Sequence, residues 1–118
     1  MRDRIALRGL RVRGFHGVLP IEREKGQDFL VDAVLHVDVR EAAASDDLED
    51  TVDFGALAVQ LAEVVAGEPV DLLETLAERL AAVCLADLRV GQAEVTVHKP
   101  GDPIPLAFAD VTVTVVRP

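Results

Sequence analysis

The sequence lacks tryptophan and tyrosine, and four phenylalanines are the only large aromatic side chains in its 118 residues. A hydrophobic core must therefore be built mainly from Leu, Val, Ile and Ala. Cys84 is the single cysteine, which excludes an intrachain disulfide. Because its neighbours Val83 and Leu85 are apolar, we expect Cys84 to be a small core residue rather than a nucleophile.

Basic residues are also scarce, since 12 Lys and Arg against 21 Asp and Glu give a net charge of −9. An acidic chain repels phosphate, so we expect neither nucleic acid nor an anionic membrane surface as a partner. No apolar run approaches the length of a membrane span. The first residues, Met1-Arg2-Asp3-Arg4, lead into a strand-like pattern without an apolar signal region, which predicts a cytoplasmic protein.

The length predicts one domain over residues 1–118. Four stretches alternate between apolar and polar residues as strands do: residues 4–13, 29–39, 93–99 and 110–115. Two stretches repeat apolar residues every three or four positions as helices do: residues 54–66 and 72–87. The order ββααββ predicts an α+β fold, with a four-stranded antiparallel sheet and two helices packed on one face.

Local signals refine this arrangement. The alternation of the first strand slips by one residue at Gly9, which predicts a β-bulge. Thr51 or Asp53 is expected to cap the first helix, and residues 40–52 to form a short helical turn or an irregular link. An open sheet of four strands leaves two edges, which favours oligomerisation through them.

The start of the second helix carries Glu74, which has two interpretations. In a capping box, Asp71 accepts from the first helical amides and Glu74 reaches back to the amide of Asp71. Alternatively, the carboxylate of Glu74 accepts two parallel N–H bonds from a planar ligand that carries an amide and an amine side by side. The spacing alone favours the cap.

Two further charged residues are candidates for a site. Glu22 lies in a long predicted loop, residues 14–28, where a solvated charge is the simpler interpretation. Lys99 follows a strand and precedes Pro100, and a lysine held at such a position in a pocket can act as a base. An exposed strand-end lysine is the simpler interpretation here too.

Known catalytic and metal-binding motifs are missing. The histidines His16, His36 and His98 do not follow a metal-ligand spacing, and no cysteine pair accompanies them, so we expect no metal site. The sequence also has no P-loop, dinucleotide fingerprint or nucleophile elbow.

Six short motifs in order carry a family resemblance: Leu7-Arg8-Gly9-Leu10, Gly14-Phe15-His16-Gly17-Val18, Glu22-Arg23 with Gly26-Gln27, Ser45-Asp46-Asp47-Leu48, Leu73-Glu74-Thr75-Leu76-Ala77-Glu78 and Val97-His98-Lys99-Pro100. With them the chain resembles the bacterial dihydroneopterin aldolases of folate biosynthesis over nearly its full length. The resemblance implies the tunnelling fold, a homo-octamer of two stacked tetrameric rings, and active sites at subunit interfaces.

The resemblance also implies residue roles. Glu74 would bind the amino-pyrimidine edge of a pterin, helped by the backbone near Leu73, while Lys99 and Glu22 would surround its side chain and N5. Val52 and Asp53 are the other implied substrate-binding residues, in a segment supplied by the neighbouring subunit. No cofactor is implied, because the C=N bond of the dihydropterin at N5 is itself the electron sink of a retro-aldol cleavage.

One position departs from the family, since Phe54 stands where the family usually has tyrosine. The family tyrosine is associated with protonation of the enol intermediate and with epimerisation. Loss of one acid–base group typically costs about 10²–10⁴-fold in rate. A poorly protonated enol could react with dioxygen, so a cofactor-independent dihydroneopterin oxygenase is an alternative to the aldolase. A dihydroneopterin epimerase and a non-catalytic pterin-binding homologue are the others.

Overall fold

The computed structural model describes residues 3–118. Met1 and Arg2, which begin the predicted leaderless N-terminus, lie outside the described residues. The elements follow the order β1 (Arg4–Gly14), α1 (Pro20–Lys25), β2 (Gln27–His36), α2 (Arg40–Ser45), the 3-10 turn η1 (Leu48–Asp50), α3 (Phe54–Ala66), α4 (Leu73–Leu85), β3 (Gln92–His98) and β4 (Thr112–Arg117). Within residues 3–118, no helix is long and apolar enough to cross a membrane.

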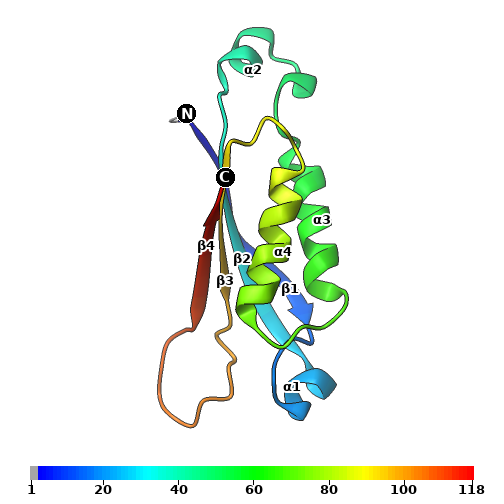
Figure 1. Cartoon of the computed structure of the whole chain (residues 1–118), viewed down its shortest axis with the longest axis vertical. Helices are drawn as coiled ribbons and strands as arrows, with labels where there is room; N and C mark the ends of the chain where they lie inside the picture. Colours follow the sequence, from blue (N-terminus) through cyan, green and yellow to red (C-terminus); the bar gives the residue numbers. More distant parts are fainter. Residues whose placement is uncertain (1–2) are drawn as a thin grey trace.

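The strands form one antiparallel sheet in the order β1-β2-β3-β4. The two long helices, α3 and α4, cover one face of this sheet and leave the other face open (Figure 1). The predicted α+β fold, with a four-stranded antiparallel sheet and two helices on one face, is confirmed. The short helices α1 and α2 lie at opposite ends of the molecule (Figure 1).

The core lies between α3 and α4 and the covered face of the sheet. Its deeply buried members alternate along β2 and β3 and recur along the helices, and they include Phe29, Val31, Ala33, Leu35, Leu61, Val65, Leu76, Ala77, Leu80, Ala81, Cys84, Ala93, Val95 and Val97. This is the inward face that the alternation predicts. Burial raises the pKa of the Cys84 thiol to about 11, as expected of a core residue rather than a nucleophile.

The predicted bulge in β1 is confirmed. The register between β1 and β2 shifts between Leu7 and Leu10, and Gly9 adopts a φ of 70°, which a residue without a Cβ adopts readily. The bulge turns the amide of Gly9 away from the ladder, and this amide donates to Oδ1 of Asp32 on β2 at 2.7 Å.

Several element boundaries differ from the prediction, and the last strand, predicted at residues 110–115, runs from Thr112 to Arg117. The loop predicted at residues 14–28 contains α1, because Pro20 favours a first helical turn and Glu22 reaches back to the amide of Leu19. The strand predicted at residues 29–39 runs instead from Gln27 to His36. It ends early because the carboxylate of Asp38 accepts from the amide of Arg40 and turns the chain into α2.

The predicted capping box at the start of α4 is wrong. Leu72, rather than Asp71, is the N-cap residue, and no side-chain cap bond forms there among the described residues. The carboxylate of Asp71 instead pairs with the guanidinium of Arg23 on α1. At α3 the cap is Asp53, which accepts from the amide of Ala56 at 3.0 Å.

His16 fixes the segment after β1 against the helical layer. Its ring is 1% exposed, donates from Nε2 to the carbonyl of Val65 at 2.6 Å, and accepts at Nδ1 from the amide of Val70 at 3.0 Å. This pattern requires the neutral ring. Burial lowers the pKa of His16 despite the hydrogen bond to Val65, and nearby Arg23 acts in the same direction.

We expect His16→Ala to destabilise the fold by about 2–4 kcal/mol, because it opens a cavity and leaves two buried backbone groups unpaired. Since the pKa of His16 is lowered in the folded state, its contribution is present above pH 6.5 and is lost as the pH falls. Urea unfolding at pH 7.5 and 5.5 should therefore show that the stability difference between the wild type and H16A shrinks at the lower pH. An equal difference at both pH values would contradict the assignment.

Candidate active site

A buried ion pair joins two segments that are distant in the sequence. Nζ of Lys99, just after β3, lies 2.5 Å from Oε2 of Glu22 on α1 and 3.5 Å from Oδ2 of Asp102. Lys99 and Glu22 are only 6% and 7% exposed. The structure thus brings together two of the predicted site residues. The simpler interpretation from the sequence, an exposed charge at each position, is wrong for both.

The backbone around α1 is shaped to hold this carboxylate. The amide of Leu19 donates to Oε1 of Glu22 at 3.2 Å. Gly17 lies directly against the carboxylate, and a Cβ at this position would approach its oxygen to 2.4 Å. The φ of Gly17, 149°, is also one that side chains rarely adopt. Glycine is therefore required here by both space and conformation.

Sequence reasoning gave no site role to Gln27 or Asp102, which complete the environment of the pair. Nε2 of Gln27 donates to Oε2 of Glu22 at 3.2 Å, while its Oε1 is buried and has no partner among the described residues. A pocket of about 160 Å³ opens beside them, lined in part by Glu22, Gln27 and Gly101. An unpaired carbonyl oxygen next to a pocket can accept a hydrogen bond from a ligand. Its only signal in the sequence is that Gln27 belongs to the Gly26-Gln27 motif.

The electrostatics keep Glu22 ionised. Burial alone would raise the pKa of Glu22, but hydrogen bonds from Lys99 and the Leu19 amide more than offset burial and hold the pKa below its ordinary value of 4.5. A carboxylate paired with an amine in this way can exchange a proton with a ligand or a bound water molecule. The pair therefore has the chemistry of an acid–base centre.

Glu74 and Leu73 begin α4 at the same end of the molecule as α1 (Figure 1). Glu74 is exposed, and its carboxylate has no hydrogen-bond or ion-pair partner within residues 3–118. Leu73 is 9% exposed, so its side chain belongs to the core, and its backbone forms part of the first turn of α4. A pocket of about 500 Å³ lies between the loop before α1 and this turn, lined in part by Val18 and Leu72.

The remaining predicted site residues lie at the other end of the subunit. Val52, Asp53 and Phe54 precede or begin α3, a helix of 13 residues and hence about 20 Å long, and Figure 1 places the start of α3 opposite α1. Val52 is buried, and the carboxylate of Asp53 is occupied as the helix cap. Phe54 is 57% exposed, so it is not part of the core stripe of its helix. A single chain does not bring these residues to Lys99.

The histidines do not converge. His16 is hydrogen-bonded in the core, whereas His98 lies on the open face of the sheet between Asp32 and Asp110. Within residues 3–118, no group of three or more His, Cys, Asp or Glu side chains is placed to hold a metal ion.

Proteins of one known family match this chain over nearly its full length. The family model for dihydroneopterin aldolase matches residues 5–116. The chain belongs to the dihydroneopterin aldolase family. It is 60% identical over 115 residues to the dihydroneopterin aldolase of Streptomyces coelicolor, covering 98% of this chain and 97% of that one. It is 39% identical over 116 residues to the enzyme of Bacillus subtilis, with coverage of 98% and 97%.

Solved structures of dihydroneopterin aldolases share the fold. The Escherichia coli enzyme in complex with neopterin matches with a TM-score of 0.89 at 28% identity, covering 98% of this chain and 99% of that chain. The enzyme of Burkholderia thailendensis, bound to guanine, matches with a TM-score of 0.79 at 29% identity, with coverage of 98% and 89%.

We expect Lys99→Met to destabilise this family member by about 3–5 kcal/mol, because it leaves the carboxylate of Glu22 buried without its partner. Adding Glu22→Gln should restore a large part of this loss, giving a coupling of about 1–3 kcal/mol in a double-mutant cycle. Urea unfolding at fixed protein concentration measures both. Arg40→Met, which removes an exposed ion pair with Asp38, serves as the control and should cause no measurable loss. Strictly additive effects of K99M and E22Q would contradict the buried pair.

Proposed function

We propose that this protein carries out the retro-aldol cleavage of 7,8-dihydroneopterin with Lys99 and Glu22 as its proton-transfer pair. As a member of the dihydroneopterin aldolase family, it is an aldehyde-lyase of folate biosynthesis. The products are 6-hydroxymethyl-7,8-dihydropterin and glycolaldehyde. The observation that carries the residue assignment is the buried contact of 2.5 Å between Lys99 and Glu22 beside a pocket.

The chemistry requires only proton transfers and orientation. Removal of the proton from the 2′-hydroxyl lets the C1′–C2′ bond break. Its electrons form a C1′=C6 double bond, and the π electrons of the C6=N5 bond move to N5, which gains a proton. Glycolaldehyde leaves, and the remaining enol is then protonated at C1′ while N5 loses its proton. Lys99, through a water molecule, is the proposed proton-transfer group, and Glu22 positions the side-chain hydroxyls or that water.

The pterin ring is proposed to bind at the start of α4. The carboxylate of Glu74 is exposed and unpaired within residues 3–118, so it is free to accept two parallel N–H bonds from the amino-pyrimidine edge. Val18 and Leu72 line the adjacent pocket and offer apolar contacts to the faces of a flat ring. Backbone groups near Leu73 complete the ring site in this proposal.

The complete site is proposed to form between subunits of a homo-octamer built from two stacked tetramers. Three observations support assembly. The predicted site residues lie at opposite ends of one chain. The subunit is elongated, with a radius of gyration of 15.4 Å against about 13–14 Å for a compact domain of this length. Large apolar side chains are exposed near the site and in the loop before β4: Val18, Leu72, Ile104, Leu106 and Phe108. Val52, Asp53 and Phe54 would then come from the neighbouring subunit.

A second activity is favoured by Phe54. The exposed ring of Phe54 carries no hydroxyl, and Asp53 beside it is occupied as a helix cap and is a poor substitute acid. We propose that slow protonation of the enol lets part of it react with dioxygen. This side reaction would cleave the C6=C1′ bond of the enol, leaving one oxygen atom on C6 to give a dihydroxanthopterin and releasing C1′ with the other as formic acid, without any cofactor.

The decisive experiment is product analysis with 7,8-dihydroneopterin in air and under anaerobic conditions. We expect the wild type to form hydroxymethyl-dihydropterin and glycolaldehyde in both, with an additional oxygen-dependent product in air. Phe54→Tyr should raise aldol turnover by up to about 10²-fold and suppress that product, and Lys99→Met should lower turnover by about 10²–10⁴-fold. Fast, oxygen-insensitive turnover by the wild type would remove the proposed role of Phe54.

The proposed assembly is tested by light scattering of the purified protein. We expect the mass of eight chains of 12.7 kDa, because site residues and exposed apolar side chains both require neighbours. Leu106→Asp, which places a charge in the exposed loop before β4, should shift the mass toward smaller species and lower turnover with it. A fully active monomer would contradict a site shared between subunits.

A further inference from the structure

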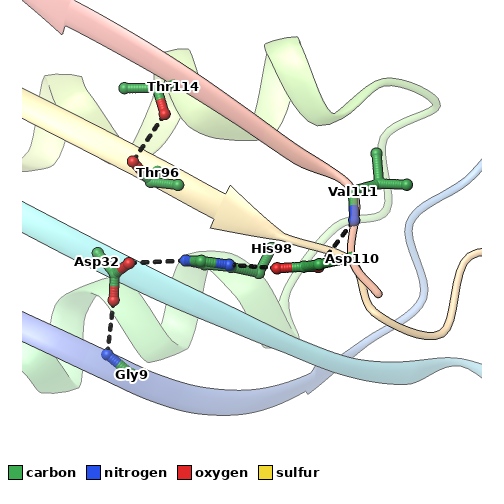
Figure 2. Close-up of polar contacts among 7 residues, drawn as sticks. All are labelled: Gly9, Asp32, Thr96, His98, Asp110, Val111 and Thr114. Atoms are coloured by element: carbon green, nitrogen blue, oxygen red, sulfur yellow. Dashed lines mark hydrogen bonds and ion pairs between the residues drawn. The ribbon is translucent and has the colours of Figure 1, made fainter. Parts of the chain in front are cut away.

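A chain of hydrogen bonds crosses the open face of the sheet, away from the helices (Figure 2). Nε2 of His98 lies 2.7 Å from Oδ2 of Asp32, and Nδ1 of His98 lies 2.7 Å from Oδ2 of Asp110. Ionised carboxylates only accept hydrogen bonds, so both ring nitrogens must donate and His98 must be an imidazolium. We name this arrangement the Asp32–His98–Asp110 clamp.

Both ends of the clamp are anchored to backbone amides. The second oxygen of Asp32 accepts from Gly9, the amide exposed by the bulge in β1, at 2.7 Å. The second oxygen of Asp110 accepts from Val111, just before β4, at 2.8 Å. One imidazolium therefore links β1, β2 and β3 to the point where the loop between β3 and β4 returns to the sheet (Figure 2).

The clamp is adjacent to Lys99 in the chain but on the opposite face. Successive residues of a strand point to opposite sides, so His98 faces the open side while Lys99 faces Glu22. The amide of Lys99 donates to the carbonyl of Val111 at 2.8 Å, the residue whose own amide Asp110 holds. The position of the Lys99 backbone thus depends on where the clamp fixes Val111.

The loop held by the clamp also contributes to the site. Asp102 lies 3.5 Å from Nζ of Lys99, and its amide donates to the carbonyl of Lys99 at 3.2 Å. Gly101 and Pro103 line the pocket beside Glu22. If Asp110 is released from His98, the loop end nearest β4 keeps only the backbone hydrogen bond from Lys99 to Val111, so these groups are held less firmly against Lys99.

We propose that His98 is a positioning residue for Lys99, acting through the Asp32–His98–Asp110 clamp, which is closed only while the imidazole carries both protons. The proposal rests on the proposed role of Lys99 in proton transfer. His98 itself touches no reacting atom. Its effect is to keep the loop between β3 and β4 against the site.

The charges around the ring set the direction of the pH dependence. Hydrogen bonds to Asp110 and Asp32 raise the pKa of His98 above its ordinary value of 6.5. On the same face, β1 contributes Arg8 and Arg11, and β3 contributes Glu94. The residues that β4 contributes there are two threonines and a valine, which do not titrate in this range. The clamp is therefore fully closed below pH 6.5 and opens as the pH rises through the elevated pKa of His98.

Two variants separate the proton from the contact. H98Q supplies one side-chain donor group where the clamp needs two, so it should weaken the clamp at every pH. In D110N, the introduced amide can donate to Nδ1 of a neutral imidazole while its carbonyl accepts from Val111, so the clamp should stay closed without the second ring proton. T114V is the matched control, because it removes the neighbouring Thr96–Thr114 hydrogen bond of 2.8 Å on the same face without touching the loop.

The test measures kcat against pH for the whole protein, together with the affinities for neopterin and guanine. We expect H98Q to lower kcat by about ten- to a hundredfold through misplacement of Lys99. It should also weaken binding of neopterin, which carries a side chain, but not of guanine, which has only the ring edge. The wild type and T114V should share an alkaline loss of kcat and of neopterin affinity that H98Q and D110N both lack.

Several outcomes would overturn the proposal: wild-type kcat and pH profile in H98Q, the wild-type alkaline loss in D110N, or equal weakening of guanine and neopterin binding. If D110N folds poorly, D32N makes the same test with the opposite ring tautomer, since its introduced amide faces Nε2. Failure of the underlying function is distinguishable. Wild-type turnover in K99M would remove the role of Lys99, while the pH dependence of neopterin affinity would still report on the clamp.

Discussion

The buried ion pair between Lys99 and Glu22 is the interaction on which the rest of the site depends. Taking two charges out of water costs several kcal/mol, and that cost is recovered only when each remaining hydrogen-bonding position is filled. The Leu19 amide, the Gln27 side chain and Asp102 fill these positions. The helix α1, in the β1–β2 connection, presents this carboxylate, and the loop after β3 brings Asp102 to the amine.

Much of the fold could be predicted because it rests on local periodicity. Alternation identified the strands and their buried face, and the phase slip at Gly9 identified the bulge. The features that could not be predicted depend on contacts between side chains that are far apart in the sequence. Asp71 has the spacing of a helix cap, but Arg23 of α1 takes its carboxylate. His98 meets Asp32 across 66 positions through the register of β2 and β3, which alternation alone does not specify.

The predicted site residues lie at two ends of the subunit because of the same architecture. Because α3 and α4 run antiparallel along the sheet, the start of α3 and the start of α4 must lie a helix length apart. A ligand that contacts the start of α3 and the start of α4 at once can therefore do so only by binding between two subunits. The open sheet face, with its polar and charged residues, remains accessible in one chain. It carries the Asp32–His98–Asp110 clamp, which is linked to the backbone of Lys99 through Val111.

The burial of Cys84 has a practical consequence for observing this protein. With its only thiol sealed in the core and resistant to ionisation, a cysteine introduced on the surface becomes the sole site for a thiol-reactive dye. The absence of tryptophan and tyrosine likewise leaves the near-ultraviolet almost free of protein signal. The fluorescence of a bound pterin, and energy transfer from it to a dye at a chosen surface position, could therefore be followed during turnover.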